Sequence, residues 1–135
     1  MCGIVGLFLK DKALEPELGA MLTDMLITMT DRGPDSAGLA IYGREEKSKA
    51  KLTVQSDTPD QDFNGLCADL EKELKVAVQM TTNSTHAVLE VPQSQAASTR
   101  MILRRIRPNI RIMGVGTSLE IYKEVGLPKD VAERF

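Results

Sequence analysis

The hydrophobic residues between Lys49 and Gly116 change their spacing several times, and this pattern constrains the fold more than any other feature of the sequence. Alternating apolar residues predict strands, because successive side chains of a strand point to opposite faces. Apolar residues three and four positions apart predict helices that bury one stripe. Strands are expected over residues 51–55, 76–80, 87–91 and 110–115, and helices over residues 63–74 and 92–106.

These elements follow one another in the order β-α-β-β-α-β, which is the order of a ferredoxin-like split βαβ unit. The polar stretch Thr81–Thr85 is expected to form the hairpin loop between the second and third strands. We interpret residues 49–116 as an insertion that is carried by a sheet from the N-terminal part of the chain.

The residues on either side of this insertion predict that carrier sheet. Gly3–Lys10 has almost no polar alternation, which favours a strand buried on both faces. Pro16 suits the first turn of a helix, and the apolar stripe from Leu18 to Met29 predicts that this helix ends near Thr30. Further along, the sequence predicts a strand over Ala37–Tyr42, a solvated hairpin tip over Arg44–Lys49, an extended piece over Leu119–Tyr122 and a last helix from Pro128.

The predicted organisation has three parts. Residues 1–48 form the N-terminal part of a domain, residues 49–116 form the insertion, and residues 117–135 return toward the second half of that domain. The fold class is α+β.

Composition excludes several classes of function. The 135 residues suffice for one ordinary domain or for part of a larger one. With a net charge of −2, no overall electrostatic attraction to nucleic acid or membrane is expected. The apolar run Ile4–Leu9 is too short to span a bilayer, and no signal peptide is visible, which predicts a cytoplasmic protein. In that compartment a disulfide between Cys2 and Cys67 is not expected.

Cys2 directly follows the start methionine. Because a small second residue permits removal of Met1, the mature chain is expected to begin with Cys2 and to carry a thiol and a free α-amine on one residue. Their ordinary pKa values, about 8.5 for the thiol and about 7.7–8.0 for the amine, allow both groups to exchange protons near neutrality. Such a residue can act as nucleophile and base together. The alternative is a small buried hydrophobe, as free cysteines often are.

A second feature is the segment Asp31–Gly38, which reads Asp-Arg-Gly-Pro-Asp-Ser-Ala-Gly. Its Gly, Pro and Asp residues are typical of a simple turn. However, Arg32 and Asp35 bracket the bend that leads into a predicted strand. The Arg32 guanidinium could pair there with a carboxylate or with main-chain carbonyls and fix the neighbouring backbone.

Taken together, Met1-Cys2-Gly3-Ile4-Val5-Gly6, the following helix and the motif Arg32–Gly38 resemble the start of a class II glutamine amidotransferase domain, the Ntn-hydrolase type of glutaminase. Amidophosphoribosyltransferase, glucosamine-6-phosphate synthase and the glutamate synthases have such domains. The insertion and the segment Glu120–Gly126 look most like the amidotransferase subunit of N-methylglutamate synthase and related glutamate-synthase-like proteins. The resemblance implies the start of an αββα sandwich that carries the ferredoxin-like insertion.

The resemblance also implies a chemistry. Cys2 would attack the carboxamide of L-glutamine, its own α-amine would act as base, and a thioester would be hydrolysed to glutamate. The ammonia would pass to a synthase subunit or domain, so a hetero-oligomer is expected. Arg32, Gly33 and Asp35 match the family motif and would shape the loop beside the nucleophile. No cofactor is implied for this chain.

Other parts of the family pattern have no match in this sequence. The family has a Gly-His-x-Arg type motif whose Arg holds the glutamine carboxylate, an Asn-Gly pair that forms the oxyanion hole, and an Asp for the substrate amine. Asn64-Gly65 lies within the apolar stripe of a predicted helix, so we interpret this pair as structural. The sequence therefore predicts a truncated or split amidotransferase domain. The competing hypothesis is a non-catalytic interaction or regulatory module built on the βαββαβ unit.

The remaining candidates favour structural interpretations. His86 is placed at the polar hairpin and is expected on the surface, while Cys67 lies on a core stripe and is expected to be inert. Arginines cluster near the second helix of the insertion, where they predict a solvated face or a docking face for an acidic partner or a phosphate: Arg100, Arg104, Arg105, Arg107 and Arg111. No metal-ligand spacing is present, and Gly114-Val115-Gly116 lacks the rest of a phosphate-binding loop.

Overall fold

The computed structural model describes residues 3–135, which divide into two compact units. One unit consists of Ala40–Tyr122 and the other of residues 3–39 together with Lys123–Phe135. Both combine helices with sheets, and the strands of the larger sheet are antiparallel, which confirms the α+β class.

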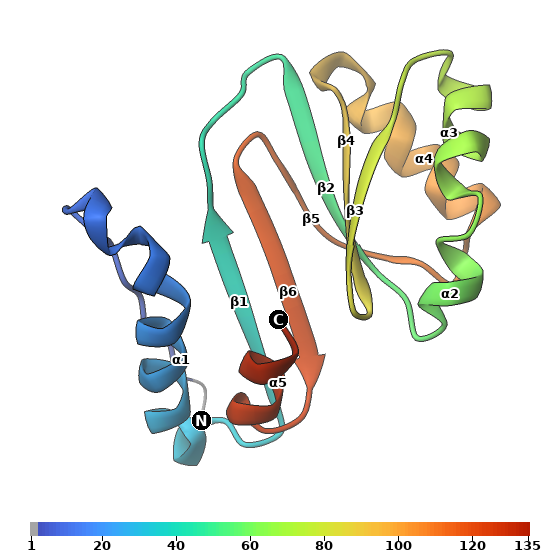
Figure 1. The fold of residues 1–135 in the computed structure, drawn as a ribbon. Helices are drawn as coiled ribbons and strands as arrows, with labels where there is room; N and C mark the ends of the chain where they lie inside the picture. The colour runs from blue at the N-terminus through green and yellow to red at the C-terminus, as the bar shows by residue number, and fades with distance from the viewer. Residues whose placement is uncertain (1–2) are drawn as a thin grey trace. The chain divides into compact units, whose positions relative to one another are not determined.

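The unit Ala40–Tyr122 contains a four-stranded antiparallel sheet with helices on one face (Figure 1). Its strands lie in the order β3-β4-β2-β5. The elements follow one another in the predicted β-α-β-β-α-β order: β2 (Lys49–Gln55), α2 (Pro59–Asp62), α3 (Leu66–Leu74), β3 (Gln79–Asn83), β4 (His86–Pro92), the 3₁₀ turn η3 (Gln93–Gln95), α4 (Ala96–Ile106) and β5 (Arg111–Gly116).

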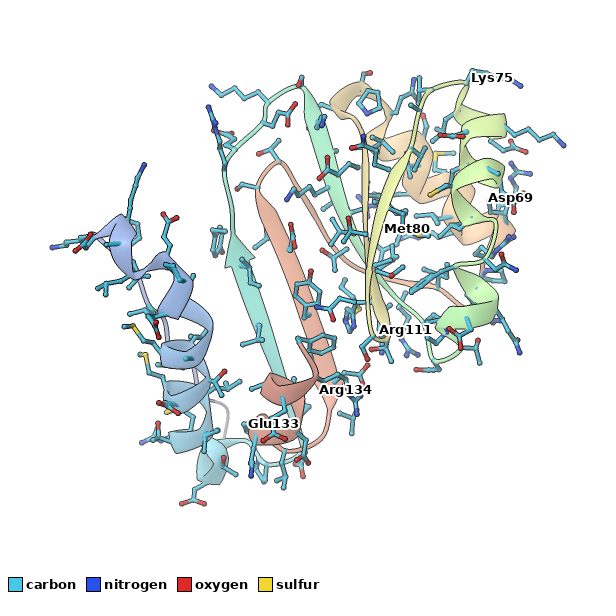
Figure 2. The ribbon with its side chains drawn as sticks, in the orientation of Figure 1. Asp69, Lys75, Met80, Arg111, Glu133 and Arg134 are labelled. Atoms are coloured by element: carbon cyan, nitrogen blue, oxygen red, sulfur yellow. The ribbon has the colours of Figure 1, made fainter. Side chains whose placement is uncertain are left out.

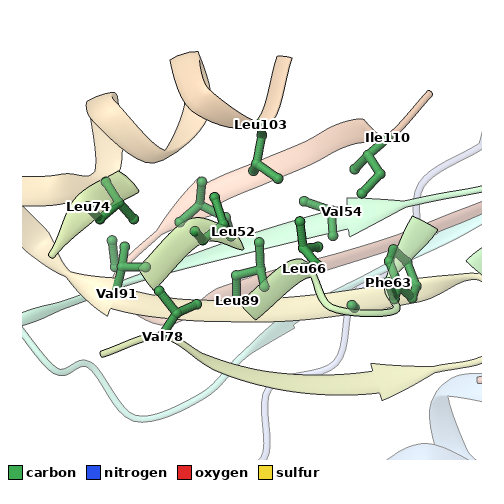
Figure 3. Close-up of a cluster of buried hydrophobic side chains, with 13 residues drawn as sticks. Leu52, Val54, Phe63, Leu66, Leu74, Val78, Leu89, Val91, Leu103 and Ile110 are labelled. Atoms are coloured by element: carbon green, nitrogen blue, oxygen red, sulfur yellow. The ribbon is translucent and has the colours of Figure 1, made fainter. Parts of the chain in front are cut away.

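The hydrophobic core lies between this sheet and its helices (Figure 3). The register places Leu52 of β2 opposite Leu89 of β4. Every side chain that these two strands direct toward this face is buried. Fully burying one leucine or valine side chain contributes about 1.5–3 kcal/mol. The side chains that the sequence pattern assigns to strands and helices therefore meet in one cluster, which includes Leu52, Val54, Phe63, Leu66, Leu70, Leu74, Val78, Leu89, Val91, Leu103 and Ile110.

The second face of the sheet is covered by strand β6 (Leu119–Val125), whose residues 119–122 belong to the same unit. Lys51 Nζ lies 2.5 Å from Glu120 Oε1, and the N–H of Ile121 donates to Thr53 Oγ1 at 3.1 Å. Gly114 of β5 lies directly beneath Ile121, since a Cβ at position 114 would be 2.8 Å from Ile121 Cδ1. Alternate residues of β2 thus serve two different layers.

Three predicted boundaries in this unit are wrong. The expected helix over residues 63–74 is interrupted, because Gly65 adopts a left-handed conformation (φ +69°) between α2 and α3. The expected loop Thr81–Thr85 shrinks to two residues, Ser84 and Thr85, because Asn83 pairs with His86 and extends both strands. Strand β3 also begins only at Gln79, after the predicted start.

The second unit contains one long helix, the first residues of strand β1 (Ser36–Tyr42) and the last residues of strand β6. Helix α1 (Leu18–Thr28) follows the 3₁₀ turn η1 (Lys12–Glu17), where the N–H of Ala13 donates to Asp11 Oδ1 at 2.9 Å. The 3₁₀ turn η2 (Thr30–Arg32) and strand β1 follow. Strand β1 pairs with β6, and helix α5 (Pro128–Arg134) contacts α1. No residue of α1 is buried.

The strand predicted over Gly3–Lys10 is not formed. Ile4 and Phe8 are 95% and 85% exposed, and no strand of residues 3–135 pairs with this segment. An apolar run forms a strand only when a neighbour takes up its N–H and C=O groups. The hairpin predicted around Arg44–Lys49 is wrong as well, because β1 pairs with β6 whereas β2 pairs with β4 and β5. The segment is exposed, as expected.

Within residues 3–135, none of the helices combines the length and the apolar character that crossing a membrane requires.

Replacing Gly114 by alanine is expected to destabilise the unit Ala40–Tyr122. The added methyl group overlaps Ile121, whose branched side chain is held by the backbone of β6, and overpacking of this kind costs about 1–3 kcal/mol. Urea denaturation measures the change in free energy of unfolding. Gly43→Ala is the matched control, because its methyl group would meet only Ser118 O at 3.8 Å. Equal stability of the two variants would contradict the packing of β6 on this face.

Candidate functional site

A pocket of about 270 Å³ lies in the unit formed by residues 3–39 and 123–135. All seven residues of the motif Arg32–Gly38 line it. The remaining wall is formed by Gly3, by Leu26 and Met29 at the end of α1, and by Lys123 and Pro128. The motif that the sequence singled out therefore lines a pocket.

Local hydrogen bonds shape the start of this motif. After α1 the chain tightens into 3₁₀ turns, in which the N–H of Arg32 donates to Met29 O at 2.9 Å and the N–H of Gly33 to Thr30 O at 3.1 Å. The hydroxyl of Thr30 donates to Ile27 O at 2.6 Å and satisfies a carbonyl at the helix end. These bonds place Arg32 and Gly33 at the rim of the pocket.

The motif is also tied to the turn between β6 and α5. The carbonyl of Asp35 accepts a hydrogen bond from the N–H of Gly126 at 3.0 Å. Gly126 has a φ of +141°, a conformation that residues with a side chain rarely adopt. This contact explains how Lys123 and Pro128, remote in sequence, come to line the same pocket.

The two charged side chains of the motif do not pair in the way that the sequence allowed. Both Arg32 and Asp35 are exposed. Among residues 3–135, neither the Arg32 guanidinium nor the Asp35 carboxylate makes a hydrogen bond or an ion pair. The backbone bonds described above hold the loop instead.

Gly3 packs closely against the motif. A Cβ at this position would lie 2.4 Å from Met29 Cε and 3.3 Å from Arg32 Cβ, so the main chain of Gly3 lies against these two side chains. The predicted nucleophile Cys2 precedes Gly3 in the chain and lies outside the described residues.

His86 is not the surface histidine that the sequence predicted. It is fully buried in β4, with Nδ1 3.0 Å from Thr85 Oγ1 and its ring centre 5.5 Å from that of Tyr122. The Tyr122 hydroxyl donates to Glu120 Oε2 at 2.9 Å, and burial, with this carboxylate, raises the pKa of Tyr122 to about 12. The prediction failed because the two-residue loop extends β4 to His86, where β6 covers it.

The arginine cluster is divided among separate ion pairs. Arg105 binds Glu73 at 2.7 Å, Arg107 binds Asp69 at 2.5 Å, and Arg111 binds Asp57 at 2.5 Å. The spacing of Arg100, Arg104 and Arg107 predicts that they share one helical face, but Arg107 follows the end of α4 and does not lie on that face. Arg100 and Arg104 are exposed, as a solvated face requires.

Cys67 and Asn64-Gly65 contribute to the fold, as the sequence predicted. Cys67 is half-buried against the core, and burial, followed by the nearby Glu71 carboxylate, raises the pKa of its thiol. Gly65 supplies the positive φ between α2 and α3. Within residues 3–135, no three His, Cys, Asp or Glu side chains come together in a way that could hold a metal ion.

Two known proteins are similar to the whole of this chain. Over 138 aligned positions it is 60% identical to a protein of Rhizobium meliloti that is named glutamine amidotransferase-like protein GlxB. It is 29% identical over 147 positions to a protein of Methanothermobacter thermautotrophicus whose name includes glutamine amidotransferase. The names of both relatives refer to glutamine amidotransferases.

The chain spans less than half the length of these relatives, 44% of the first and 47% of the second. No family model matches it, and no solved structure does.

Sequence reasoning missed the walls of the pocket that Met29, Lys123 and Pro128 provide. Lys123 and Pro128 reach the motif through the pairing of β1 with β6 and the turn at Gly126. The hydrophobic pattern marks each of these elements but does not say which of them are neighbours.

The Cys67 thiol is expected to react slowly with iodoacetamide at neutral pH and faster as the pH rises, because the thiolate is the attacking species and its pKa is raised. Peptide mass spectrometry at several pH values measures this rate. Glu71→Gln should move the profile to lower pH, since it removes the nearby negative charge and keeps an oxygen that accepts from the N–H of Val78. Rapid alkylation at pH 7 would contradict the inert role of Cys67.

Proposed function

We propose that this chain is the N-terminal part of a class II glutamine amidotransferase domain of the Ntn-hydrolase type, with Cys2 as its nucleophile. One observation carries the proposal: Gly3, the residue after Cys2, and the motif Arg32–Gly38 line the same pocket. These are the two sequence segments on which the resemblance to that class rests. The names of both relatives support glutamine amide chemistry.

The reaction begins with the Cys2 thiolate, which attacks the side-chain carbonyl carbon of L-glutamine. The α-amine of the same residue accepts the thiol proton and returns it to the departing ammonia. The resulting thioester is hydrolysed by one water molecule, which yields glutamate and frees the thiol. This chemistry requires that Met1 be removed, because a peptide nitrogen is not a base.

Arg32, Gly33 and Asp35 have a supporting role in this proposal. The backbone bonds from Met29 and Thr30 hold Arg32 and Gly33, and the bond to Gly126 holds Asp35. Gly3 packs against the side chain of Arg32, so the motif contacts the main chain directly after the proposed nucleophile. The pocket, at about 270 Å³, lies near the lower end of the volumes of small-molecule sites.

We assign residues 49–116 to a ferredoxin-like insertion, residues 1–48 to the first part of the αββα domain, and residues 117–135 to a return segment. The sheet order β3-β4-β2-β5, with α3 and α4 on one face, supports the insertion. The pairing of β1 with β6 supports the return segment, since it brings the two flanks of the insertion into one sheet.

The groups that would bind the glutamine carboxylate and form the oxyanion hole have no match in this sequence. An oxyanion-hole donor contributes about 10²–10³ in rate, so this chain by itself is expected to have little activity. In the proposal these groups come from a polypeptide that corresponds to the remaining length of the relatives. The complete cytoplasmic enzyme passes ammonia to a synthase subunit, and N-methylglutamate synthase is the candidate assembly.

The intact mass of the purified chain tests the first requirement. It should correspond to the sequence that begins at Cys2, because only then is the α-amine free. A chain that retains Met1 would exclude Cys2 as an N-terminal nucleophile.

Labelling with diazo-oxonorleucine, a glutamine analogue with an electrophilic carbon, tests the chemistry. In a chain extended by the sequence that corresponds to the rest of the relatives, Cys2 should be alkylated and glutaminase activity lost. Cys2→Ala should abolish both, whereas the matched variant Cys67→Ser should retain both, because Cys67 is half-buried with a raised thiol pKa.

The second candidate function is a non-catalytic interaction or regulatory module built on the βαββαβ unit. It is favoured by the well-formed core of that unit, in contrast to α1, which has no buried residue. Absence of Cys2 labelling in the extended chain, with Met1 removed, would select this candidate over the glutaminase.

A further inference from the structure

The four-stranded sheet of the unit Ala40–Tyr122 ends in two edge strands, β3 and β5, which differ in how they are protected. An edge strand presents unpaired N–H and C=O groups that can pair with another chain, and proteins usually block such edges with charges, prolines or bulges.

Strand β5 carries this protection. Its register with β2 shifts between Thr53 and Val54, which pair with Gly114 and Ile112, so Met113 is an extra residue that forms a bulge. A bulge bends and twists the strand. Arg111 adds a charge at the start of the strand.

Strand β3 has none of these features. Its register with β4 runs without a shift from Gln79 to Asn83. Ten consecutive residues, Val76 to Thr85, carry no charge and include no proline. Gln79, Thr81 and Thr82 are exposed, and in residues 3–135 the strand pairs with β4 alone. Figure 2 shows Met80 on this strand.

The hairpin loop determines which backbone groups of β3 are free. Because the loop has two residues, Asn83 and His86 form the hydrogen-bonded pair that closes the hairpin. Hydrogen-bonded and non-hydrogen-bonded pairs alternate along an antiparallel ladder. The N–H and C=O groups of Met80 and Thr82 therefore point away from β4, toward the open edge.

We propose that β3 pairs with β3 of a second copy of this chain, antiparallel and about a two-fold axis at Thr81, so that two four-stranded sheets become one sheet of eight strands. Met80 of each copy then exchanges hydrogen bonds with Thr82 of the other. Thr81 meets its own counterpart on the axis as a non-hydrogen-bonded pair.

The strand is complementary to itself in this arrangement. The opposed residues are Gln79 with Asn83, Met80 with Thr82, and Thr81 with Thr81, so no like charges meet. Threonine pairs across strands are stabilising. The contact is closed, because the bulged edge of β5 does not offer a second pairing site, and the assembly stops at a dimer. This inference concerns a surface in residues 40–122 and does not depend on the proposed glutaminase.

Sedimentation velocity over roughly a hundredfold range of protein concentration measures the association, which follows mass action. The wild-type chain should shift from monomer to dimer. Thr81→Lys places two ammonium groups opposite each other on the axis, and the dimer should weaken at least about tenfold. Ser98→Lys is the matched control, since it adds the same charge at an exposed position of α4 and should leave the association unchanged. A monomer at every concentration, or equal effects of both substitutions, would overturn the proposal.

Disulfide trapping tests the register. Thr81→Cys brings two Cα atoms to about 4.5 Å across the axis, within reach of a disulfide. Gln79→Cys is the control, because positions two residues off the axis are about 14 Å apart along the strands at about 3.4 Å per residue. Under mild oxidation the first variant should form more covalent dimer than the control. It should also form more than the wild-type chain, which measures the dimer that the native cysteines form. Equal trapping at both positions would overturn the pairing.

Discussion

Alternation along strand β2 is the constraint on which the larger unit depends. Leu52 and Val54 point into the core beneath α3 and α4, and the intervening Thr53 points to the opposite face, where its hydroxyl accepts from the N–H of Ile121. Because successive side chains of a strand point to opposite faces, one strand can pack against a different layer on each face. The apolar face holds the helices and the polar face holds β6. Losing the register of β2 by one residue would exchange these faces and disrupt both layers.

The same constraint explains how much of the fold the sequence predicts. Leu52 and Val54, Leu89 and Val91, and the stripe Leu66–Leu74 are recognised because their spacing is local. The failures concern properties that depend on neighbours. His86 is next to polar residues in sequence, but the tight turn at Ser84 and the cover from Tyr122 bury it. Gly3–Lys10 has the composition of a strand, yet a strand exists only with a partner.

For the candidate site, the sequence predicts the chemistry of single segments and not their assembly. The motif Arg32–Gly38 is recognisable from its Gly, Pro and Asp residues, and the structure shows that it lines a pocket. The contribution of Lys123 and Pro128 depends on a hydrogen bond between Gly126 and Asp35. Such a bond joins two backbone groups, so it leaves no mark on side-chain spacing beyond the glycine at position 126, whose φ is positive.

The two cysteines illustrate why residue type alone does not define a nucleophile. Cys67 is half-buried beside Glu71, and both burial and the negative charge favour its neutral thiol. At Cys2 of a chain without Met1, an α-ammonium on the same residue would favour the thiolate, and its conjugate amine would accept a proton. In the proposal, the α-ammonium would therefore favour the thiolate at Cys2, whereas burial and Glu71 favour the neutral thiol at Cys67. Cys67 is not among the residues that line the motif pocket, and our proposal assigns the thiol chemistry there to Cys2.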